Sequence, residues 1–137
     1  MPIQPYLFFE GRAEEAIEFY KRALGAEVTM LMRNKESPDA PPPGMLPPGS
    51  GNKIMYASLT IGDATIGVSD GTVSGKPSFQ GISLSLTAPS EADADRMFNA
   101  LAKGGEVSLP MGKTFFSPRF GMVADKFGVP WMILVAS

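Results

Sequence analysis

Hydrophobic and polar residues alternate along three stretches of the chain, a pattern typical of strands with one buried face. In residues 3–9, 55–61 and 82–87, apolar residues recur at every second position, and hydroxyl, amide or aromatic side chains fill most positions between them. The second stretch runs into Gly62-Asp63, a two-residue hairpin signal. Further strands are predicted at residues 26–32, 64–70, 106–111, 119–124 and 129–136.

Two other stretches show the three- and four-residue spacing of apolar side chains that indicates an amphipathic helix. The first covers residues 12–24, has acidic residues in its first turn and basic residues in its last, and is followed by Gly25. These charges complement the helix dipole, and the glycine marks the stop. The second begins after Ser90, an N-cap with Asp93 three residues on, and runs to about Lys103.

The order of one strand, one helix and three strands therefore occurs twice. The two halves also resemble each other, because FYKRALGAEV at residues 19–28 is echoed by MFNALAKGGEV at residues 97–107. One such unit cannot bury both faces of its sheet, so the two are expected to pair. We predict a single α+β domain, 1–137, in which two repeated βαβββ modules, about 1–70 and about 80–137, form a curved mixed sheet with an internal cavity.

Within the first module, residues 33–52 are rich in proline and glycine, which forbid regular structure. We expect a flexible surface loop of the kind that covers a binding site. The polar and aromatic faces of the alternating strands are expected to line a concave pocket with apolar walls and few polar groups. Contact of those faces with solvent explains the alternation equally well, because half-exposed sheets show the same pattern.

The amino-acid composition excludes several classes of partner and of catalytic or metal site. The 137 residues carry a net charge of −2, with 44% hydrophobic and 19% charged residues, as in an ordinary globular domain. No basic block marks a nucleic-acid partner, and no apolar run is long enough to span a membrane. Cysteine and a signal-peptide pattern are absent, so a cytoplasmic location is expected. The absence of histidine removes the Ser-His-Asp triad and every histidine-bound metal.

Four groups of residues give the chain a family resemblance. They are Pro5-Tyr6-Leu7, Glu15-Ala16 with Phe19-Tyr20, Ser69-Asp70, and Phe120-Gly121 with Asp125, Phe127-Gly128 and Trp131. Together with the duplicated order of elements, they resemble the PhnB-like family of the vicinal oxygen chelate superfamily, the glyoxalase, bleomycin-resistance and dioxygenase group. The resemblance covers nearly the whole chain and implies a small-molecule-binding homodimer. A methyltransferase label is also used in this family, and the sequence has no glycine-rich nucleotide loop to support it.

Metal-using members of the superfamily place their ligands on the first and fourth strands of each module. By the predicted register, these positions are Gln4, Gly67, Ser83 and Met132. Glycine has no side chain, and a thioether is unsuited to Zn²⁺, Mg²⁺ or Fe²⁺, which leaves Gln4 as a weak candidate. We therefore predict no bound metal and no other cofactor.

The predicted ligand-binding residues lie on the cavity face of the strands or on the loop at its mouth. They are Gln4, Tyr6, Phe8, Tyr56, Ser58, Ser83, Ser85, Phe115, Phe116, Arg119 and Met132. Arg119 suits an anionic group on a ligand, but an ion pair with Asp125 or another acid explains it as well. Tyr56 is the candidate for acid or base chemistry, and Asp125 is expected to cap its own turn.

Three functions remain open at this point. The favoured hypothesis is metal-free binding of a small molecule, as in the drug-sequestering members of the superfamily. The first alternative is a lyase- or isomerase-like enzyme that uses Tyr56 or a displaced carboxylate. The second alternative is a non-catalytic dimeric scaffold.

Overall fold

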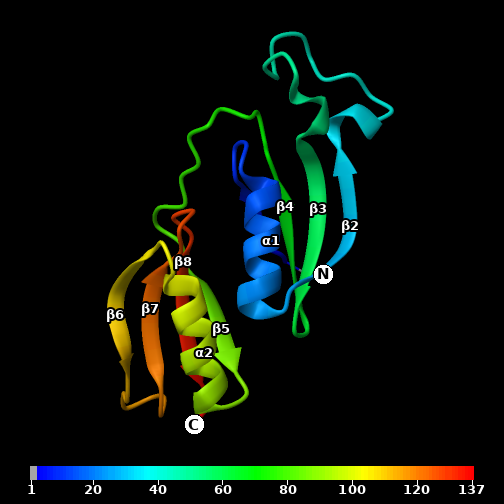
Figure 1. The fold of residues 1–137 in the computed structure, drawn as a ribbon. Helices are drawn as coiled ribbons and strands as arrows, with labels where there is room; N and C mark the ends of the chain where they lie inside the picture. Colours follow the sequence, from blue (N-terminus) through cyan, green and yellow to red (C-terminus); the bar gives the residue numbers. More distant parts are fainter. Residues whose placement is uncertain (1–2) are drawn as a thin grey trace. The chain divides into compact units, whose positions relative to one another are not determined.

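The computed structural model describes residues 3–137, which form two compact units divided between Pro77 and Ser78. Each unit contains one helix and one four-stranded sheet (Figure 1). The predicted α+β architecture of two repeated βαβββ modules is therefore confirmed.

The first unit places its helix between the first and second of four strands. Its elements are β1 (Tyr6–Phe8), α1 (Ala13–Leu24), β2 (Glu27–Arg33), β3 (Ile54–Ile61) and β4 (Ala64–Ser69). The strand order is β1-β4-β3-β2, with β1 parallel to β4 and the other pairs antiparallel. Between β2 and β3, the predicted loop contains two short 3-10 turns, η1 (Asn34–Glu36) and η2 (Ser50–Asn52), where the sequence predicted no regular structure.

The second unit repeats this arrangement. Its elements are β5 (Leu84–Ala88), α2 (Glu91–Ala102), β6 (Glu106–Gly112), β7 (Phe120–Ala124) and β8 (Pro130–Val135). The strand order β5-β8-β7-β6 corresponds position by position to that of the first unit, and β5 is parallel to β8. The Ser90 side chain accepts a hydrogen bond from the Asp93 N–H, which confirms the predicted N-cap of α2.

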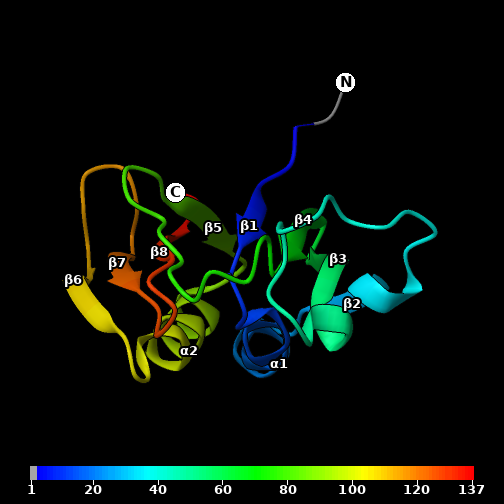
Figure 2. The ribbon, with the colours of Figure 1, turned by 90° about the horizontal axis from the view of Figure 1, so that it is seen from above.

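Each helix covers one face of its own sheet (Figure 2). In the first unit, the core between helix and sheet holds fully buried aromatic and aliphatic side chains: Leu7, Phe9, Ala16, Tyr20, Ala57, Leu59 and Val68. Burial of this apolar surface is the main stabilising contribution to such a unit. Because Leu7 and Phe9 point into this core, Tyr6 and Phe8 must point to the opposite face of β1.

Asp70 joins three elements of the first unit. Its side chain is 1% exposed and follows directly after β4. Oδ1 accepts hydrogen bonds from the N–H groups of Gly11 and Ala13 at 3.0 and 2.8 Å, and Oδ2 accepts one from the Ile54 N–H at 2.7 Å. The residue at the N-cap position, Arg12, makes no side-chain cap, so Asp70 supplies the negative charge that favours the start of α1.

Asp125 has the comparable role in the second unit. It is buried, and its Oδ1 accepts from the N–H groups of Phe127 and Val129 at 2.9 and 3.1 Å, as predicted for an aspartate that caps its own turn. Oδ2 accepts from the indole Nε1–H of Trp131 at 2.9 Å. The motif residues at the end of the chain are thus explained by the closing turn between β7 and β8.

One part of the predicted alternation is wrong. In β3, Tyr56 pairs with Met32 and Ile54 pairs with Arg33, so Met55 is an extra residue in the ladder. This β-bulge shifts the alternation, because an inserted residue reverses the faces that follow it. Ile54 therefore enters the core, and Met55, which the simple alternation placed with Ala57 on the core face, turns to the other side of the sheet.

The two parallel edge strands also begin later than predicted. Gln4 and Ser83 are exposed and precede β1 and β5, so neither occupies a strand position. In β1 this follows from Pro5, which has no N–H to donate to a ladder. The partner of Gly67 is Tyr6, and the partner of Met132 is Ser85. The predicted register, which placed Gln4 beside Gly67 and Ser83 beside Met132, is therefore wrong by two residues in each pair of strands.

Candidate ligand pocket

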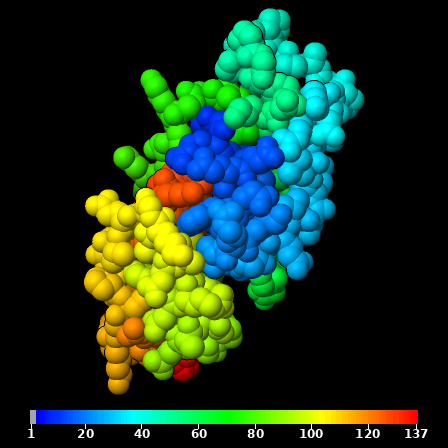
Figure 3. All heavy atoms as spheres, viewed as in Figure 1, coloured from blue at the N-terminus to red at the C-terminus, as the bar shows by residue number. Residues whose placement is uncertain are grey.

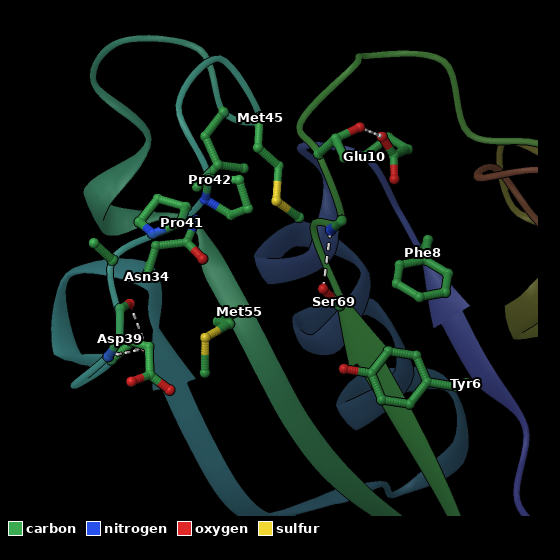
Figure 4. A pocket seen from close by; sticks show the side chains of 15 residues that line it. Tyr6, Phe8, Glu10, Asn34, Asp39, Pro41, Pro42, Met45, Met55 and Ser69 are labelled. Atoms are coloured by element: carbon green, nitrogen blue, oxygen red, sulfur yellow. Dashed lines mark hydrogen bonds between the residues drawn. The ribbon is translucent and has the colours of Figure 1, made fainter.

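A pocket of about 520 Å³ lies in the first unit, where β1 and β4 end and β3 begins. One wall is formed by Tyr6 and Phe8 of β1, and the floor includes Met55 and Ser69 (Figure 4). The opposite wall comes from the loop between β2 and β3 and is mostly apolar: Ala40, Pro41, Pro42, Met45 and Leu46. Such apolar walls with a few polar groups are typical of small-molecule sites.

Three aromatic rings form a row along the sheet beside the pocket. The ring centroids of Tyr6 and Tyr56 are 5.6 Å apart with an interplanar angle of 19°, and those of Tyr6 and Phe8 are 5.0 Å apart. The row depends on Gly67, because a Cβ atom at that position would lie 2.6 Å from Cδ2 of Tyr6. Gly67 therefore allows the Tyr6 ring to lie across β4.

The loop opposite these rings is held at its base. The Arg33 guanidinium forms an ion pair with Glu14 of α1 at 3.0 Å, and it donates to the Asn52 carbonyl at 2.7 Å. Asn34 Nδ2 donates to the Ser50 carbonyl at 3.0 Å, which connects η1 to η2. The hydrogen bond from Arg33 also lowers the pKa of Glu14. In Figure 3 the cyan-to-teal atoms of this loop form a projection at the end of the first unit.

Glu10 contributes a carboxylate to the pocket from an uncommon backbone conformation. Its φ angle is 52°, in the left-handed region that non-glycine residues rarely adopt. The Glu10 carbonyl accepts from the Gly75 N–H at 2.9 Å, and Oε1 accepts from Thr72 Oγ1 and from the Ser74 N–H at 3.1 Å each. A Cβ atom at Gly71 would overlap Oε2. These contacts fix both the strained backbone and the direction of the side chain.

The titratable groups of the pocket are shifted in opposite directions. Partial burial alone would raise the pKa of Glu10, but hydrogen bonds from Ser74 and Thr72 outweigh it and hold the pKa below its ordinary value. Burial raises the pKa of Tyr6, partly offset by a hydrogen bond with the Ser69 side chain. At neutral pH the pocket therefore presents an ionised carboxylate and a protonated phenol.

The structure brings together some of the predicted first-module residues. Tyr6 and Phe8 line the pocket. Tyr56 stacks against Tyr6 and is not itself a lining residue. Ser58 pairs with Gly67 on the same face of the sheet, one strand further from β1. Gln4 does not line this pocket. Their roles in binding stay predictions.

The predicted residues of the second module lie in the second unit and are not part of this pocket. Ser85 pairs with Met132 on the face opposite α2, and Ser83 is exposed. Phe115 is fully exposed, and Phe116 contacts Phe120 edge to face at 4.9 Å. Arg119 forms its ion pair with Asp95 of α2 at 2.8 Å, so the acid that pairs with it is Asp95.

Sequence reasoning missed several residues that line the pocket. Met55 was hidden by the bulge, which leaves no trace in the hydrophobic pattern. Glu10 and Thr72 belong to turns, where side-chain direction depends on backbone angles rather than on periodicity. Ser69 offered a signal, because it stands beside Asp70 in one of the resemblance motifs.

The chain matches, over residues 1–134, the model of a family described as 3-demethylubiquinone-9 3-methyltransferase. Protein YjdN of Escherichia coli (strain K12) is 38% identical over 142 residues, covering 98% of this chain and 95% of that protein. The chain belongs to this PhnB-like family. The PhnB protein of Bacillus cereus shares the fold with a TM-score of 0.80 and 30% identity, covering 99% of this chain and 100% of that one.

Protein PA1353 of Pseudomonas aeruginosa has a TM-score of 0.85 and 37% identity, covering 99% of this chain and 98% of that one. A glyoxalase/bleomycin resistance protein of Albidiferax ferrireducens T118 shows the same fold at a TM-score of 0.57 and 19% identity, covering 90% and 89%. The PhnB-like family thus has the glyoxalase/bleomycin-resistance fold.

Two further observations apply to residues 3–137. Their His, Cys, Asp and Glu side chains form no group of three that could hold a metal ion. Among the same residues, no helix is both long and apolar enough to cross a membrane.

Proposed function

We propose that this protein binds a small organic molecule in the pocket of the first unit. The observation that carries the proposal is the placement of Tyr6 and Phe8. Both rings lie on the face away from the core, 43% and 50% exposed, under a loop whose base is held by ion pair and hydrogen bonds. A ligand that covers such exposed aromatic surface removes it from water, and this burial stabilises the complex.

The titration state of the pocket favours binding over catalysis. A general base or acid is most effective when its pKa lies near the working pH. The pKa of Tyr6 is raised and that of Glu10 is lowered, so both are moved away from neutrality. We therefore favour binding over catalysis, and we retain the absence of a bound metal, the homodimer and the cytoplasmic location as predicted parts of the proposal.

Methyl transfer, which the family's description names, requires a site for a methyl donor. A helix N-terminus that follows a glycine-rich loop is the usual binding site for an anionic group of a nucleotide-derived ligand. In this chain the N–H groups at the start of α1 are taken by the buried Asp70 carboxylate. The first turn of α2 holds Glu91 and Asp93 beside the Ser90 cap. Neither helix start is therefore arranged to bind an anionic group of such a donor.

A fragment screen tests the proposal directly. Wild-type protein is titrated with single-ring aromatic compounds carrying a cationic, a neutral or an anionic group, and binding is followed by thermal shift and ligand-observed NMR. We expect at least one class to bind, and Phe8→Ala to weaken its binding about tenfold by removing a pocket wall. The matched control is Phe115→Ala, which also removes a phenyl ring, here a fully exposed one outside this pocket, and should leave binding unchanged. Absence of binding by all classes at millimolar concentration would overturn the proposal.

A further inference from the structure

We infer that the pocket selects an organic cation, such as an amine or guanidinium attached to an apolar body. The inference rests on the proposed function and adds the ligand's charge to it. Of the 15 residues that line the pocket, Glu10 and Asp39 are acidic and none is lysine or arginine. They flank the pocket from different segments, Glu10 after β1 and Asp39 in the loop (Figure 4).

The Glu10 carboxylate lies beside an aromatic ring. A Cβ atom placed on Gly71 would meet both Glu10 Oε2 and, at 3.1 Å, Cδ1 of Phe8, so these two side chains border the same small space. A cation bound at the Glu10 carboxylate would therefore lie close to the Phe8 ring as well. Aromatic faces attract cations, and hydrogen bonds from Thr72 and Ser74 keep the carboxylate in place without a basic partner.

The Asp39 carboxylate is available to a ligand. Ser37 Oγ donates to the Asp39 carbonyl at 3.0 Å and accepts from the Asp39 N–H at 3.2 Å, which fixes the backbone of this turn. Across residues 3–137, no hydrogen bond or ion pair is recorded for the Asp39 side chain, which is exposed. This carboxylate adds negative potential at the loop side of the pocket.

Two basic residues at the base of the loop are already engaged, and Lys35 of η1 is not among the residues that line the pocket. Arg33 pairs with Glu14 and donates to the Asn52 carbonyl, and Lys53 Nζ donates to the Gly11 carbonyl at 2.8 Å. An anionic ligand would therefore meet two carboxylates without an offsetting cation. The sequence had suggested an anionic ligand through Arg119, but that guanidinium pairs with Asp95 in the second unit.

Three probes with one ring and nearly equal length separate charge from shape. They are 2-phenylethylamine, 2-phenylethanol and 3-phenylpropionate, titrated by ligand-observed NMR at pH 7 and low salt. We expect the amine to bind about tenfold more tightly than the alcohol, and the carboxylate to bind most weakly. The preference should shrink at high salt, because exposed charges are screened.

Charge-removing variants assign the preference to named groups. Glu10→Gln and Asp39→Asn should each weaken amine binding three- to tenfold and leave alcohol binding unchanged. Glutamine keeps an acceptor for Thr72 and Ser74. Asp63→Asn, in the hairpin turn at the other end of β3 and β4, removes the same charge outside the pocket and should change nothing.

The outcomes distinguish this inference from the proposed function. If the alcohol or the carboxylate binds as tightly as the amine, the cation preference is wrong while ligand binding stands. If amine binding is tight but unaffected by both charge-removing variants, the assignment to Glu10 and Asp39 is wrong. If none of the three probes binds, both the inference and the proposed function are contradicted.

Discussion

The two units share one frame but carry different side chains on the face away from the helix. In the first unit, a row across the sheet reads Tyr6, Gly67, Ser58 and Met30. In the second, the corresponding row reads Ser85, Met132, Met122 and Leu109. Gly67 allows a tyrosine ring to lie over the sheet, whereas Met132 fills the equivalent position with its own side chain. The same topology therefore offers an aromatic platform in one unit and a methionine surface in the other.

The loops differ as well. Residues 34–53 connect β2 to β3, whereas residues 113–119 connect the equivalent strands β6 and β7. The longer connection is long enough to return over the sheet and to form a wall of prolines and a methionine. The comparison shows that the pocket depends on this loop and on a few side chains, and not on the repeated fold itself.

The largest effect is expected where the two units begin their helices. Asp70→Ala leaves two buried N–H groups and one part-buried N–H group without a partner. Each buried group costs about 1–3 kcal/mol, so the free energy of unfolding should fall by about 3 kcal/mol or more. Ser90→Ala removes a local cap of α2 and should cost about 1 kcal/mol.

Urea unfolding followed by far-UV circular dichroism measures both variants. The single tryptophan, Trp131, adds a fluorescence signal for the second unit. Equal losses for Asp70→Ala and Ser90→Ala would contradict the claim that one distant aspartate holds the first unit together.

The next effect concerns the position at which the rows differ most. Gly67→Ala forces the Tyr6 ring away from β4 and should weaken 2-phenylethylamine binding about tenfold, at a stability cost of about 1–3 kcal/mol. Met132→Ala at the equivalent position should leave this binding unchanged. Isothermal titration calorimetry measures the affinity of both variants for 2-phenylethylamine. Wild-type affinity in Gly67→Ala would show that binding does not need the aromatic row.

A smaller, pH-dependent effect is expected from Glu10. The pKa of Glu10 is lowered in the folded protein, so its hydrogen bonds contribute stability that is complete above the unfolded pKa and is lost as the pH falls through the folded pKa. Amine binding should be constant from about pH 8 to 6 and should decline only as the pH falls below the ordinary glutamate pKa of about 4.3, because the pKa of Glu10 is lowered. Glu10→Gln should make this decline smaller, and a variant that keeps the wild-type pH profile would exclude Glu10 as a cause.

The smallest effect is expected for Arg119→Met. The ion pair with Asp95 is partly exposed, so its loss should lower stability by less than about 1 kcal/mol. Probe binding in the first unit should not change. A loss of affinity in this variant, measured in the same titration, would show that Arg119 takes part in ligand binding after all.

The sequence predicted the parts of the molecule that periodicity and capping control. The helices, the Ser90 cap, the turn at Gly62-Asp63 and the repeated order are all present in the structure. The bulge at Met55 could not be predicted, because an inserted residue changes the faces without changing the composition of the strand.

The same limit applied to the candidate site. Tyr6 and Phe8 were found because they lie in an alternating strand, whereas Glu10 reaches the pocket only through a left-handed backbone angle. The charge of the pocket therefore emerged from turn geometry and not from the strand pattern. The distant contact of Asp70 with α1 likewise spans 57 residues of sequence and has no local signature.

The most direct test uses the methionines, because both units contain them. Met45 and Met55 line the pocket of the first unit, and Met122 and Met132 belong to the second unit. With methyl-labelled methionine, titration of 2-phenylethylamine should shift the signals of Met45 and Met55 and leave those of Met122 and Met132 in place. Shifts confined to Met122 and Met132, or none at saturating probe, would contradict a ligand pocket in the first unit.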